Sequence, residues 1–379
     1  MGADERAFDV VVVGAGAAGV GVGVALRHAG IENFIVIDRH HVGASFDAWP
    51  AETRFITPSF PTNSVGMLDL NAVAVGTSPA FSMGVEHPSG PEFAEHLRGV
   101  ARFFELPIRT GVEVTGVAEG GAGFVLETAS GRLRARFVIW AAGEFQYPRL
   151  DGFPGAGHCL HTANIRRYGE LVGDDWVVIG GYESGVDAAY HLARLGRRVR
   201  LFDGGCPWGE SDSDPSVSLS TYSRERMSEE AFEGRVELHP QSPIAEVKRF
   251  DLGDSGLAEY ETRLVDGRGF RGRQPPLLAT GFEGSWSLVG EHFWRREDGY
   301  PELSEEDEST VVPGLFLVGP AVRHDSHVFC FIFKFRQRFA VVAKAIATRL
   351  GLPAEELEAY RRWGMYLDDL SCCGEPCAC

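Results

Sequence analysis

A run of apolar, mostly β-branched residues followed directly by a glycine-rich turn restricts the fold of this chain more than any other sequence feature. Residues 8–13 form the run, and residues 14–19 read Gly-Ala-Gly-Ala-Ala-Gly, which is the spacing Gly-x-Gly-x-x-Gly. The first glycine permits a tight turn, the second lets a diphosphate approach the backbone, and the third lets the next helix pack against the strand. We therefore expect a buried parallel strand, a phosphate-binding turn and a helix that ends near Gly30.

A second short apolar run, at 34–37, ends in Asp38, which lies 24 positions after Gly14. A carboxylate at about this distance accepts a hydrogen bond from a ribose hydroxyl. A glycine-rich turn without a ligand is the alternative, and the complete order strand, turn, helix, strand and acid disfavours it. The first unit is therefore predicted to bind a dinucleotide through Gly14, Gly16, Ala18, Gly19, Asp38 and Arg39.

The same pattern returns 166 positions later in the chain. Residues 176–179 form an apolar run, residues 180–185 a glycine-containing turn, and the stretch 198–202 leads to Asp203. Asp203 lies 23 positions after Gly180, so the chain contains an internal repeat of a dinucleotide-binding unit. The residues of the second copy that we expect around a coenzyme are Gly180, Tyr182, Ser184, Gly185 and Asp203.

The second copy departs from the first at Tyr182, which stands where the second glycine belongs. A side chain there crowds an approaching diphosphate, so this site is either rebuilt or no longer binds a dinucleotide. Asp203 favours a free 2′-hydroxyl and hence NADH. The nearby Arg197, Arg198 and Arg200 could instead bind a 2′-phosphate, so the pattern leaves the choice between NADH and NADPH open.

Composition and charge exclude several classes of protein. Hydrophobic residues make up 44% of the 379 residues, which is enough for a sizeable core. The formal net charge of −17 repels nucleic acid and anionic membranes, so neither is an expected partner. The first residues are charged, and no apolar run approaches the roughly 18 residues of a membrane span. We therefore expect a cytoplasmic protein whose seven cysteines are free thiols, redox groups or metal ligands.

Two nucleotide-binding units in one chain imply electron transfer between two cofactors. The chain resembles the flavoproteins with two dinucleotide-binding domains, and within them the small bacterial flavin-containing monooxygenase-like proteins, a group linked to cation efflux. Three further segments carry the resemblance, at 138–143, 277–281 and 310–320. They are similar to the exit from the first FAD segment, the exit from the NAD(P) domain and the last FAD motif of those proteins.

The resemblance implies an α/β fold of two nested Rossmann-like domains, as in the glutathione and thioredoxin reductases. FAD would bind to 1–165 and 301–350 and NAD(P)H to an inserted domain at 166–300, and a helical, cysteine-rich tail would occupy 351–379. The resemblance also implies cofactor contacts from Ser45, Trp49, Val114, Ala142, Gly143, Gly281, Gly319 and Pro320. Trp49 would lie along the flavin, with a place in the core as the alternative.

The chain also departs from the disulfide reductases of this superfamily. Its last FAD motif ends in Gly319-Pro320, where those reductases have Gly-Asp. Residues 1–350 contain no Cys-x-x-Cys or Cys-x4-Cys pair, and Ala17 and Ala18 stand where some relatives have a loop cysteine. The fingerprint of flavin monooxygenases is only partly present, with His161 as its histidine. These differences move the chain away from the thioredoxin-reductase branch.

His324, Asp325 and His327 are the candidate acid–base residues, because histidine titrates near neutral pH. A metal site at this cluster is the less favoured alternative. Phenylalanines alternate at 329, 331, 333 and 335, which predicts an extended strand before a helix directed at the flavin. We interpret this stretch as a dry wall near the flavin, as a homodimer interface or as plain core.

The C-terminal tail combines helical spacing over 353–370 with a cluster of cysteines. Cys372, Cys373, Cys377 and Cys379 suit a soft metal such as Cu(I), Zn or Hg(II). Cys372 and Cys373 also resemble the mobile thiol pair of mercuric reductase, which makes them candidate catalytic residues. A terminus with incidental thiols is the alternative.

Together these features predict an FAD-dependent NAD(P)H oxidoreductase that acts on a small molecule. The leading hypothesis is a monooxygenase-like enzyme, in which hydride passes to flavin N5 and O2 adds at C4a. The resulting C4a-hydroperoxyflavin would oxygenate a soft nitrogen or sulfur nucleophile. One alternative is a thiol- or metal-directed flavin reductase that uses the tail cysteines. The other is a flavin-binding redox sensor or metal carrier whose second site takes no coenzyme.

Overall fold

The computed structural model describes residues 7–61, 68–121, 123–209, 212, 214, 216–253 and 256–371. The chain divides into two compact units. Unit 1 comprises Met1–Asp47, Pro58–Gln146 and Gly284–Cys379, and unit 2 comprises Ala48–Thr57 and Tyr147–Glu283. Each unit contains one copy of the repeated nucleotide-binding pattern.

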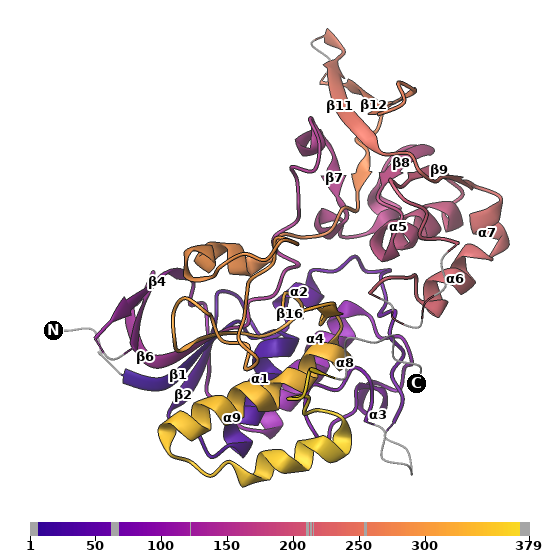
Figure 1. Cartoon of the computed structure of the whole chain (residues 1–379). Helices are drawn as coiled ribbons and strands as arrows, with labels where there is room; N and C mark the ends of the chain where they lie inside the picture. Colours follow the sequence, from indigo (N-terminus) through magenta and orange to yellow (C-terminus); the bar gives the residue numbers. More distant parts are fainter. Residues whose placement is uncertain are drawn as a thin grey trace. The chain divides into compact units, whose positions relative to one another are not determined.

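Unit 1 is built on a mixed sheet whose first strand, β1, leads into the first glycine turn (Figure 1). Its strands are β1 (Ala7–Val13), β2 (Phe34–Asp38), β3 (Ile108–Thr110), β4 (Val114–Gly120), β5 (Gly123–Thr128), β6 (Gly131–Trp140) and β15 (Leu315–Leu317). The order β3-β2-β1-β6 is parallel, and β15 pairs in parallel with the last residues of β6. β4 and β5 form an antiparallel meander with the first half of β6.

The longer helices of unit 1 are apolar where they meet the sheet or one another. They are α1 (Ala17–His28), α4 (Gly90–Phe103) and α9 (Phe339–Leu350), with the shorter α2 (Ala44–Asp47), α3 (Pro79–Met83) and α8 (Ile332–Phe335). Residues 17–26 of α1 are all buried, and an ideal Cβ on Gly21 would lie 2.1 Å from the Phe339 ring. Glycine at this position therefore lets α1 and α9 pack at close range (Figure 1).

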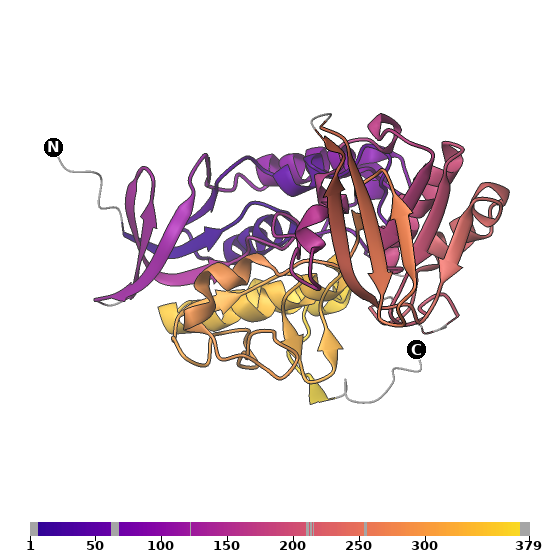
Figure 2. The same ribbon diagram turned by 90° about the horizontal axis from the view of Figure 1, so that it is seen from above.

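Unit 2 repeats the arrangement on a five-stranded parallel sheet. In sheet order its strands are β10 (Val236–His239), β9 (Arg198–Phe202), β8 (Asp175–Ile179), β14 (Leu277–Leu278) and β7 (Leu160–His161). Helix α5 (Glu183–Arg194) follows the second glycine turn, and α6 (Thr221–Met227) and α7 (Glu230–Glu233) pack near it. A separate antiparallel sheet consists of β11 (Ile244–Asp251), β12 (Ala258–Leu264) and β13 (Gly269–Gly272), drawn in orange in Figure 2.

The predicted fold class, α/β with two Rossmann-like units, is confirmed by this topology. The predicted helix after the first turn ends at His28, close to the expected Gly30. In the second unit the expected helix and the following strand are α5 and β9. Local pattern was sufficient here because strand, turn and helix are contiguous in both copies.

The extended strand expected from the alternating phenylalanines is wrong. The structure has a strand only at β17 (His327–Val328), paired with β16 (Arg323–His324), and α8 begins at Ile332. Ile332 and Phe335 are buried and lie three residues apart, so helical spacing prevails over alternation. In the tail, η7 (Glu355–Trp363) is a 3-10 helix in place of the expected regular helix, with Leu357 and Tyr360 buried.

The junctions between the units also differ from the expected positions 165/166 and 300/301. Residues 147–165 belong to unit 2 because β7 pairs with β14. The segment from Gly284 to about position 300 belongs to unit 1, where Ser285 donates its N–H to the carbonyl of Gly143 at 2.8 Å. The tail through residue 371 is part of unit 1, and Tyr360 bonds to His28 at 2.8 Å. Residues 48–57, expected within the FAD segment, lie in unit 2.

A buried ion network fastens the last part of unit 1. Arg338 and Asp307 are both fully buried, and the Arg338 guanidinium donates to the Asp307 carboxylate at 2.9 and 3.0 Å. His324 bonds to the same carboxylate at 2.5 Å. Arg338 also donates to the carbonyls of Glu305 and Leu367. Each guanidinium nitrogen of Arg338 and each carboxylate oxygen of Asp307 therefore has a partner inside the protein. Within the described residues, no helix is long and apolar enough to cross a membrane.

We expect Arg338→Ala to lower the free energy of unfolding by about 3–5 kcal/mol, because it leaves a buried carboxylate without its cation. The matched control is Arg361→Ala, which removes an exposed pair with Asp368 at 2.7 Å. That change should cost at most about 1 kcal/mol. Urea unfolding of both variants gives the comparison, and equal losses would contradict the structural role of the Arg338 network.

Candidate functional site

The candidate site of unit 1 lies at the carboxyl edge of its parallel strands. β1, β6 and β15 are neighbours and end at the same edge, so the segments that follow them come together. These segments are the turn at 14–19, the stretch 141–146 and the stretch 318–323. The ideal Cβ of Gly319 would lie 3.3 Å from the Cβ of Ala18, which brings the first and last predicted flavin motifs into contact.

The glycine turn of unit 1 has the geometry of a diphosphate cradle. Gly14 adopts a left-handed φ of +109°, and a Cβ on it would lie 2.4 Å from the carbonyl oxygen of Ala141. A Cβ on Gly19 would lie 1.8 Å from the carbonyl oxygen of Gly14, so α1 starts in close contact with β1. By contrast, a Cβ on Gly16 would meet no atom within 4 Å. The residues present therefore fit a diphosphate at the N-terminus of α1.

Asp38 and its neighbours form a chain of hydrogen bonds beside this turn. The Asp38 carboxylate accepts the N–H of Ala15 at 2.8 Å and that of His40 at 2.7 Å. Arg39 donates to the side-chain oxygen of Gln146 at 2.9 Å. Gln146 in turn donates to the hydroxyl of Ser45 at 3.0 Å. The fold thus brings Arg39 and Ser45 together, and Gln146, which the sequence analysis missed, connects them.

Of the other residues expected around the flavin, all but Trp49 lie in unit 1. Gly143 has a left-handed φ of +68° and Gly319 one of +109°; Ala142 and Pro320 flank them in the segments after β6 and β15. Val114 begins β4, two residues after Val112, which donates its N–H to the Asp38 carbonyl at 2.9 Å. Trp49 belongs to unit 2, where its ring lies 4.9 Å from that of Phe55.

The three candidate acid–base residues lie around the hairpin β16–β17. His324 is buried and directs its Nε2 at Asp307, so its ring serves the ion network described above. Asp325 is exposed, has a left-handed φ of +47° and accepts at its carbonyl from Arg296 at 2.7 Å. His327 is half-buried, with Nδ1 at 3.2 Å from the His324 carbonyl. Their roles in catalysis remain predictions.

The cysteines contribute little to the described site. Cys372, Cys373, Cys377 and Cys379 lie outside the described residues. Of the described cysteines, Cys159 is in unit 2, and burial raises the pKa of its thiol to about 12. Such a thiol is a poor nucleophile. Among the residues that the structure describes, no group of three His, Cys, Asp or Glu side chains is arranged to hold a metal ion.

The turn of unit 2 repeats that of unit 1 in detail. Gly180 has a φ of +100°, and a Cβ on Gly185 would lie 1.7 Å from the Gly180 carbonyl oxygen. Asp203 accepts the N–H of Gly181 at 2.7 Å, as Asp38 accepts that of Ala15. The backbone of Tyr182 (φ −86°, ψ −163°) matches that of Gly16 (φ −82°, ψ −163°). Tyrosine is therefore accommodated without backbone strain.

Aromatic side chains distinguish the second turn from the first. The Tyr182 hydroxyl donates to the Ser218 carbonyl at 2.6 Å, and the Tyr182 ring packs against the core of unit 2. Trp208 donates its indole N–H to the Gly181 carbonyl at 2.8 Å, and a Cβ on Gly181 would lie 2.5 Å from the Trp208 ring. Ser184 is exposed at the start of α5. The backbone of the turn and Asp203 fit a dinucleotide. The space beside Gly16 in unit 1 is open, whereas the equivalent space in unit 2 holds the side chain of Tyr182.

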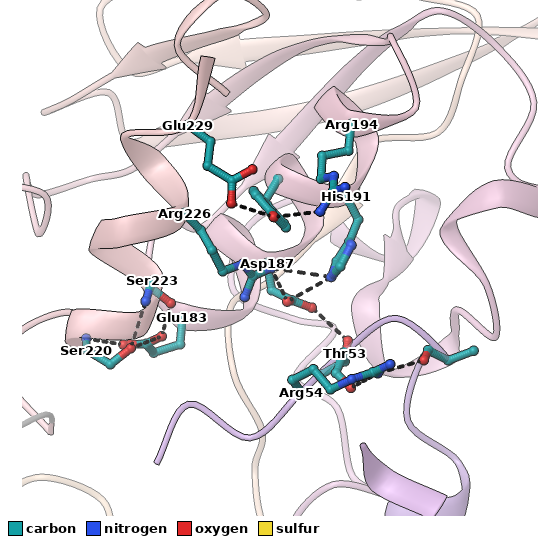
Figure 3. A network of polar contacts seen from close by, with 12 residues as sticks. Thr53, Arg54, Glu183, Asp187, His191, Arg194, Ser220, Ser223, Arg226 and Glu229 are labelled. Atoms are coloured by element: carbon teal, nitrogen blue, oxygen red, sulfur yellow. Dashed lines mark hydrogen bonds and ion pairs between the residues drawn. The ribbon is translucent and has the colours of Figure 1, made fainter. Parts of the chain in front are cut away.

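Behind this turn, α5 carries a buried polar network (Figure 3). The Asp187 carboxylate accepts from Arg226 at 2.6 Å and from Thr53 at 2.7 Å, and His191 lies 3.2 Å away. Burial alone would raise the Asp187 pKa, but these hydrogen bonds and the charges of His191 and Arg226 hold it below its usual range. Because Thr53 lies in 48–57, the network fixes that segment to α5.

Three hydrogen bonds shape the exit from unit 2. Gly281 has a left-handed φ of +83°, and its carbonyl accepts from the N–H of Arg149 at 3.0 Å. His161 is buried, with Nε2 at 3.1 Å from the same carbonyl and Nδ1 accepting the N–H of Ala163 at 3.1 Å. Burial lowers the His161 pKa. A neutral His161 therefore fixes the segment that leaves unit 2.

One titratable residue with a shifted pKa, in the segment that follows β6, was missed by the sequence analysis. Glu144 directly follows Gly143 and is half-buried. Burial raises the pKa of its carboxyl to about 7, and the charge of Arg323 offsets part of this shift. The sequence offered one signal, an acid next to the glycine that ends a buried strand. That signal does not reveal burial.

Comparison with known proteins agrees with this geometry. A family model described as pyridine nucleotide-disulphide oxidoreductase matches residues 11–319. The chain belongs to this family. It is 27% identical over 192 residues to the uncharacterized oxidoreductase CzcO of Bacillus velezensis, an alignment that covers 49% of this chain and 52% of that protein. The chain thus spans about half the length of this curated relative.

Two solved structures show the same fold at low sequence identity. The bacillithiol disulfide reductase Bdr of Staphylococcus aureus has a TM-score of 0.71 at 17% identity, over 91% of this chain and 99% of that chain. A flavin-containing monooxygenase of Stenotrophomonas maltophilia has a TM-score of 0.70 at 16% identity, again over 91% and 99%. At these identities the two likenesses show the fold of this chain.

The two outer glycines and the central glycine of the first turn should respond differently to substitution. Gly19→Ala places a methyl group on the Gly14 carbonyl and should cost about 3 kcal/mol of unfolding free energy or more. Gly16→Ala, the matched control, should cost no more than about 1 kcal/mol. It should nevertheless weaken FAD binding about tenfold, because its methyl group faces the diphosphate. Thermal melts and FAD titration measure both, and a Gly16→Ala variant with normal FAD affinity would contradict the assignment.

Proposed function

We propose that this protein is an FAD-dependent oxidoreductase that takes hydride from NADH and uses O2 to oxygenate a small molecule with a soft nitrogen or sulfur nucleophile. FAD, when bound, supplies the redox chemistry, accepting hydride from the nicotinamide and passing electrons to the acceptor. The residues of unit 1 hold it. The turn at 14–19 binds the diphosphate at the start of α1, and Asp38 lies where a ribose hydroxyl would be bound.

The observation that carries the oxygen-dependent proposal is the thiol content of unit 1. In the part of unit 1 that the structure describes, Cys330 is the single cysteine. Ala17 and Ala18 occupy the first loop. Reduction of a disulfide through the enzyme's own thiols needs a second thiol to release the mixed disulfide. The described flavin unit offers no such pair, which favours O2 as the direct acceptor.

A thiol-directed reductase is the second candidate, and a specific similarity favours it. The Bdr protein whose structure shares this fold is named a bacillithiol disulfide reductase. The tail cysteines, from Cys372 on, could supply the thiol pair that the described part of unit 1 lacks. The two candidates differ in whether the tail is needed for turnover.

The contacts of Asp203 support NADH as the coenzyme. Its two carboxylate oxygens accept the N–H groups of Gly181 and Gly205 at 2.7 and 2.8 Å, which fixes the charge at the end of β9. A carboxylate held there accepts a bond from a 2′-hydroxyl and repels a 2′-phosphate.

The three arginines that could have reversed this preference are engaged elsewhere. Arg197 donates to the carbonyls of Tyr168 and Leu171. Arg198 pairs with Asp175 at 2.7 Å, at the opposite end of β9 from Asp203. The third, Arg200, pairs with Glu237 at 3.7 Å. Because these arginines have other partners, the charge of Asp203 determines the preference for NADH over NADPH.

The coenzyme proposal predicts that NAD+ binds at least about tenfold more tightly than NADP+, a difference of about 1.4 kcal/mol. Asp203→Asn keeps an acceptor oxygen but removes the charge, so it should narrow this ratio by strengthening NADP+ binding. Arg198→Ala is the control and should change neither affinity. Calorimetric titration of the full-length protein measures the affinities, and selective loss of NADP+ binding in the arginine variant would contradict this account.

A second prediction tests the acceptor. Deletion of residues 372–379 should leave two rates unchanged: anaerobic bleaching of the bound flavin by NADH, and O2 consumption with substrate. The physical reason is that oxygen reacts without a protein thiol. Stopped-flow absorbance and an oxygen electrode measure the two rates. If instead the deletion abolished turnover with a low-molecular-weight disulfide while bleaching persisted, the thiol-directed reductase would be the correct function.

A further inference from the structure

A cleft of about 300 Å³ lies within unit 2, between its parallel sheet and its antiparallel sheet. Asp175 on β8 and Arg200 on β9 line the first wall. Tyr260 on β12 and Phe270 on β13 line the second wall. Phe202 shares a face of β9 with Arg200, and its ring centre lies 4.9 Å from that of Phe270. The two walls therefore face each other inside unit 2.

The cleft combines apolar side chains with open space. Val177 and Phe270 supply an apolar surface on the two walls. Gly272 pairs with Tyr260 across β12 and β13, and a Cβ on Gly272 would meet no atom within 4 Å. The glycine therefore leaves room beside the Tyr260 ring. Clefts of about 300 Å³ or more, with apolar walls and a few polar groups, are typical of sites that bind small molecules.

The Asp175 carboxylate brings an unused acceptor to this cleft. Its Oδ2 accepts from the Arg198 guanidinium at 2.7 Å. Its Oδ1 is buried and has no hydrogen-bond partner among the described residues. A polar atom that is withdrawn from water without a partner is costly. A ligand that carries an N–H group would supply the missing donor.

Three other side chains bring unused donors to the same cleft. The half-buried Arg200 lies 3.7 Å from the Glu237 carboxylate, which is too far for a hydrogen bond, and 6.0 Å from the centre of the Phe270 ring. Within the described part of the chain, no hydrogen bond engages the Tyr260 hydroxyl or the Gln274 amide, and both residues line the cleft. A guanidinium with free N–H groups binds a carboxylate well. The cleft therefore suits a ligand that has both a carboxylate and an N–H donor.

This cleft is separate from the second glycine turn. Asp175 is the first residue of β8, whereas Gly180 follows the last residue of that strand. At about 3.3 Å per residue, an extended strand separates these two positions by about 16 Å. Asp203, which holds the turn, lies beyond the carboxyl end of β9. A ligand in the cleft would therefore leave the turn free.

We propose that the cleft between the two sheets of unit 2 binds a free α-amino acid with an apolar side chain. Its ammonium group donates to Asp175 Oδ1, its carboxylate accepts from Arg200, and its side chain packs against Phe270. A simple anion would leave Asp175 without a donor, and a simple amine would leave Arg200 without an acceptor. The zwitterion satisfies both. This binding site is additional to the proposed function and does not depend on FAD, NADH or the acceptor.

Calorimetric titration of the full-length protein tests the ligand class with L-phenylalanine and L-leucine as probes. At least one of them should bind with a Kd of about 1 mM or tighter. Two analogues of phenylalanine separate its charges: 3-phenylpropionate lacks the ammonium group, and phenethylamine lacks the carboxylate. Each should bind at least about tenfold more weakly than phenylalanine, because each loses a hydrogen-bonded ion pair.

Variants of the cleft test where the amino acid binds. Asp175→Asn and Arg200→Ala should each weaken binding at least about tenfold. Asp174→Asn, which changes the exposed acid next to Asp175, is the matched control and should bind as the wild type does. Thermal melts establish that the three variants fold. Absence of binding for both amino acids, equal affinity for 3-phenylpropionate and phenylalanine, or unchanged affinity in Asp175→Asn and Arg200→Ala would overturn the inference.

Discussion

The close contact between the start of a helix and the end of a strand is the constraint on which both units depend. In each unit a Cβ on the last glycine of the turn would lie within 2 Å of the carbonyl oxygen of the first, at 1.8 Å for Gly19 and 1.7 Å for Gly185. Only glycine permits this approach. The contact directs the N-terminus of the helix, with its unpaired N–H groups and partial positive charge, to the edge where a diphosphate binds.

The two units keep this backbone and use it differently. Asp38 and Asp203 fasten the turns through equivalent N–H groups. In unit 1 the direction of a Cβ on Gly16 is open, whereas in unit 2 the Tyr182 ring occupies it and Trp208 lies against the turn. A diphosphate at these turns would therefore meet bare backbone in the first unit and aromatic side chains in the second. The two copies thus share the backbone geometry of the turn and differ in the side chains that surround it.

The carboxylates that the fold withdraws from water differ in their partners and in the direction in which their pKa values move. The Asp187 carboxylate, paired with Arg226 and beside His191, has a pKa held below its usual range, and its network fixes the segment 48–57 to α5. Glu144 is half-buried, and burial raises the pKa of its carboxyl, as it also does for Glu183, which accepts hydrogen bonds from Ser220 and Ser223. The direction of each shift depends on whether the hydrogen bonds and cations at the carboxyl outweigh its burial.

By itself the sequence determined the two strand–turn–helix units, their acids and their common fold. These depend on contiguous residues, where apolar runs, glycine spacing and chain direction act over a few residues at a time. Tertiary structure decided what depends on distant neighbours. It replaced the expected strand at 329–335 by α8, placed Trp49 in unit 2, and brought Gln146 and Trp208 to their turns. It also shifted the pKa of Glu144. The burial of a carboxyl and the position of an arginine far along the chain exist only once the chain has folded.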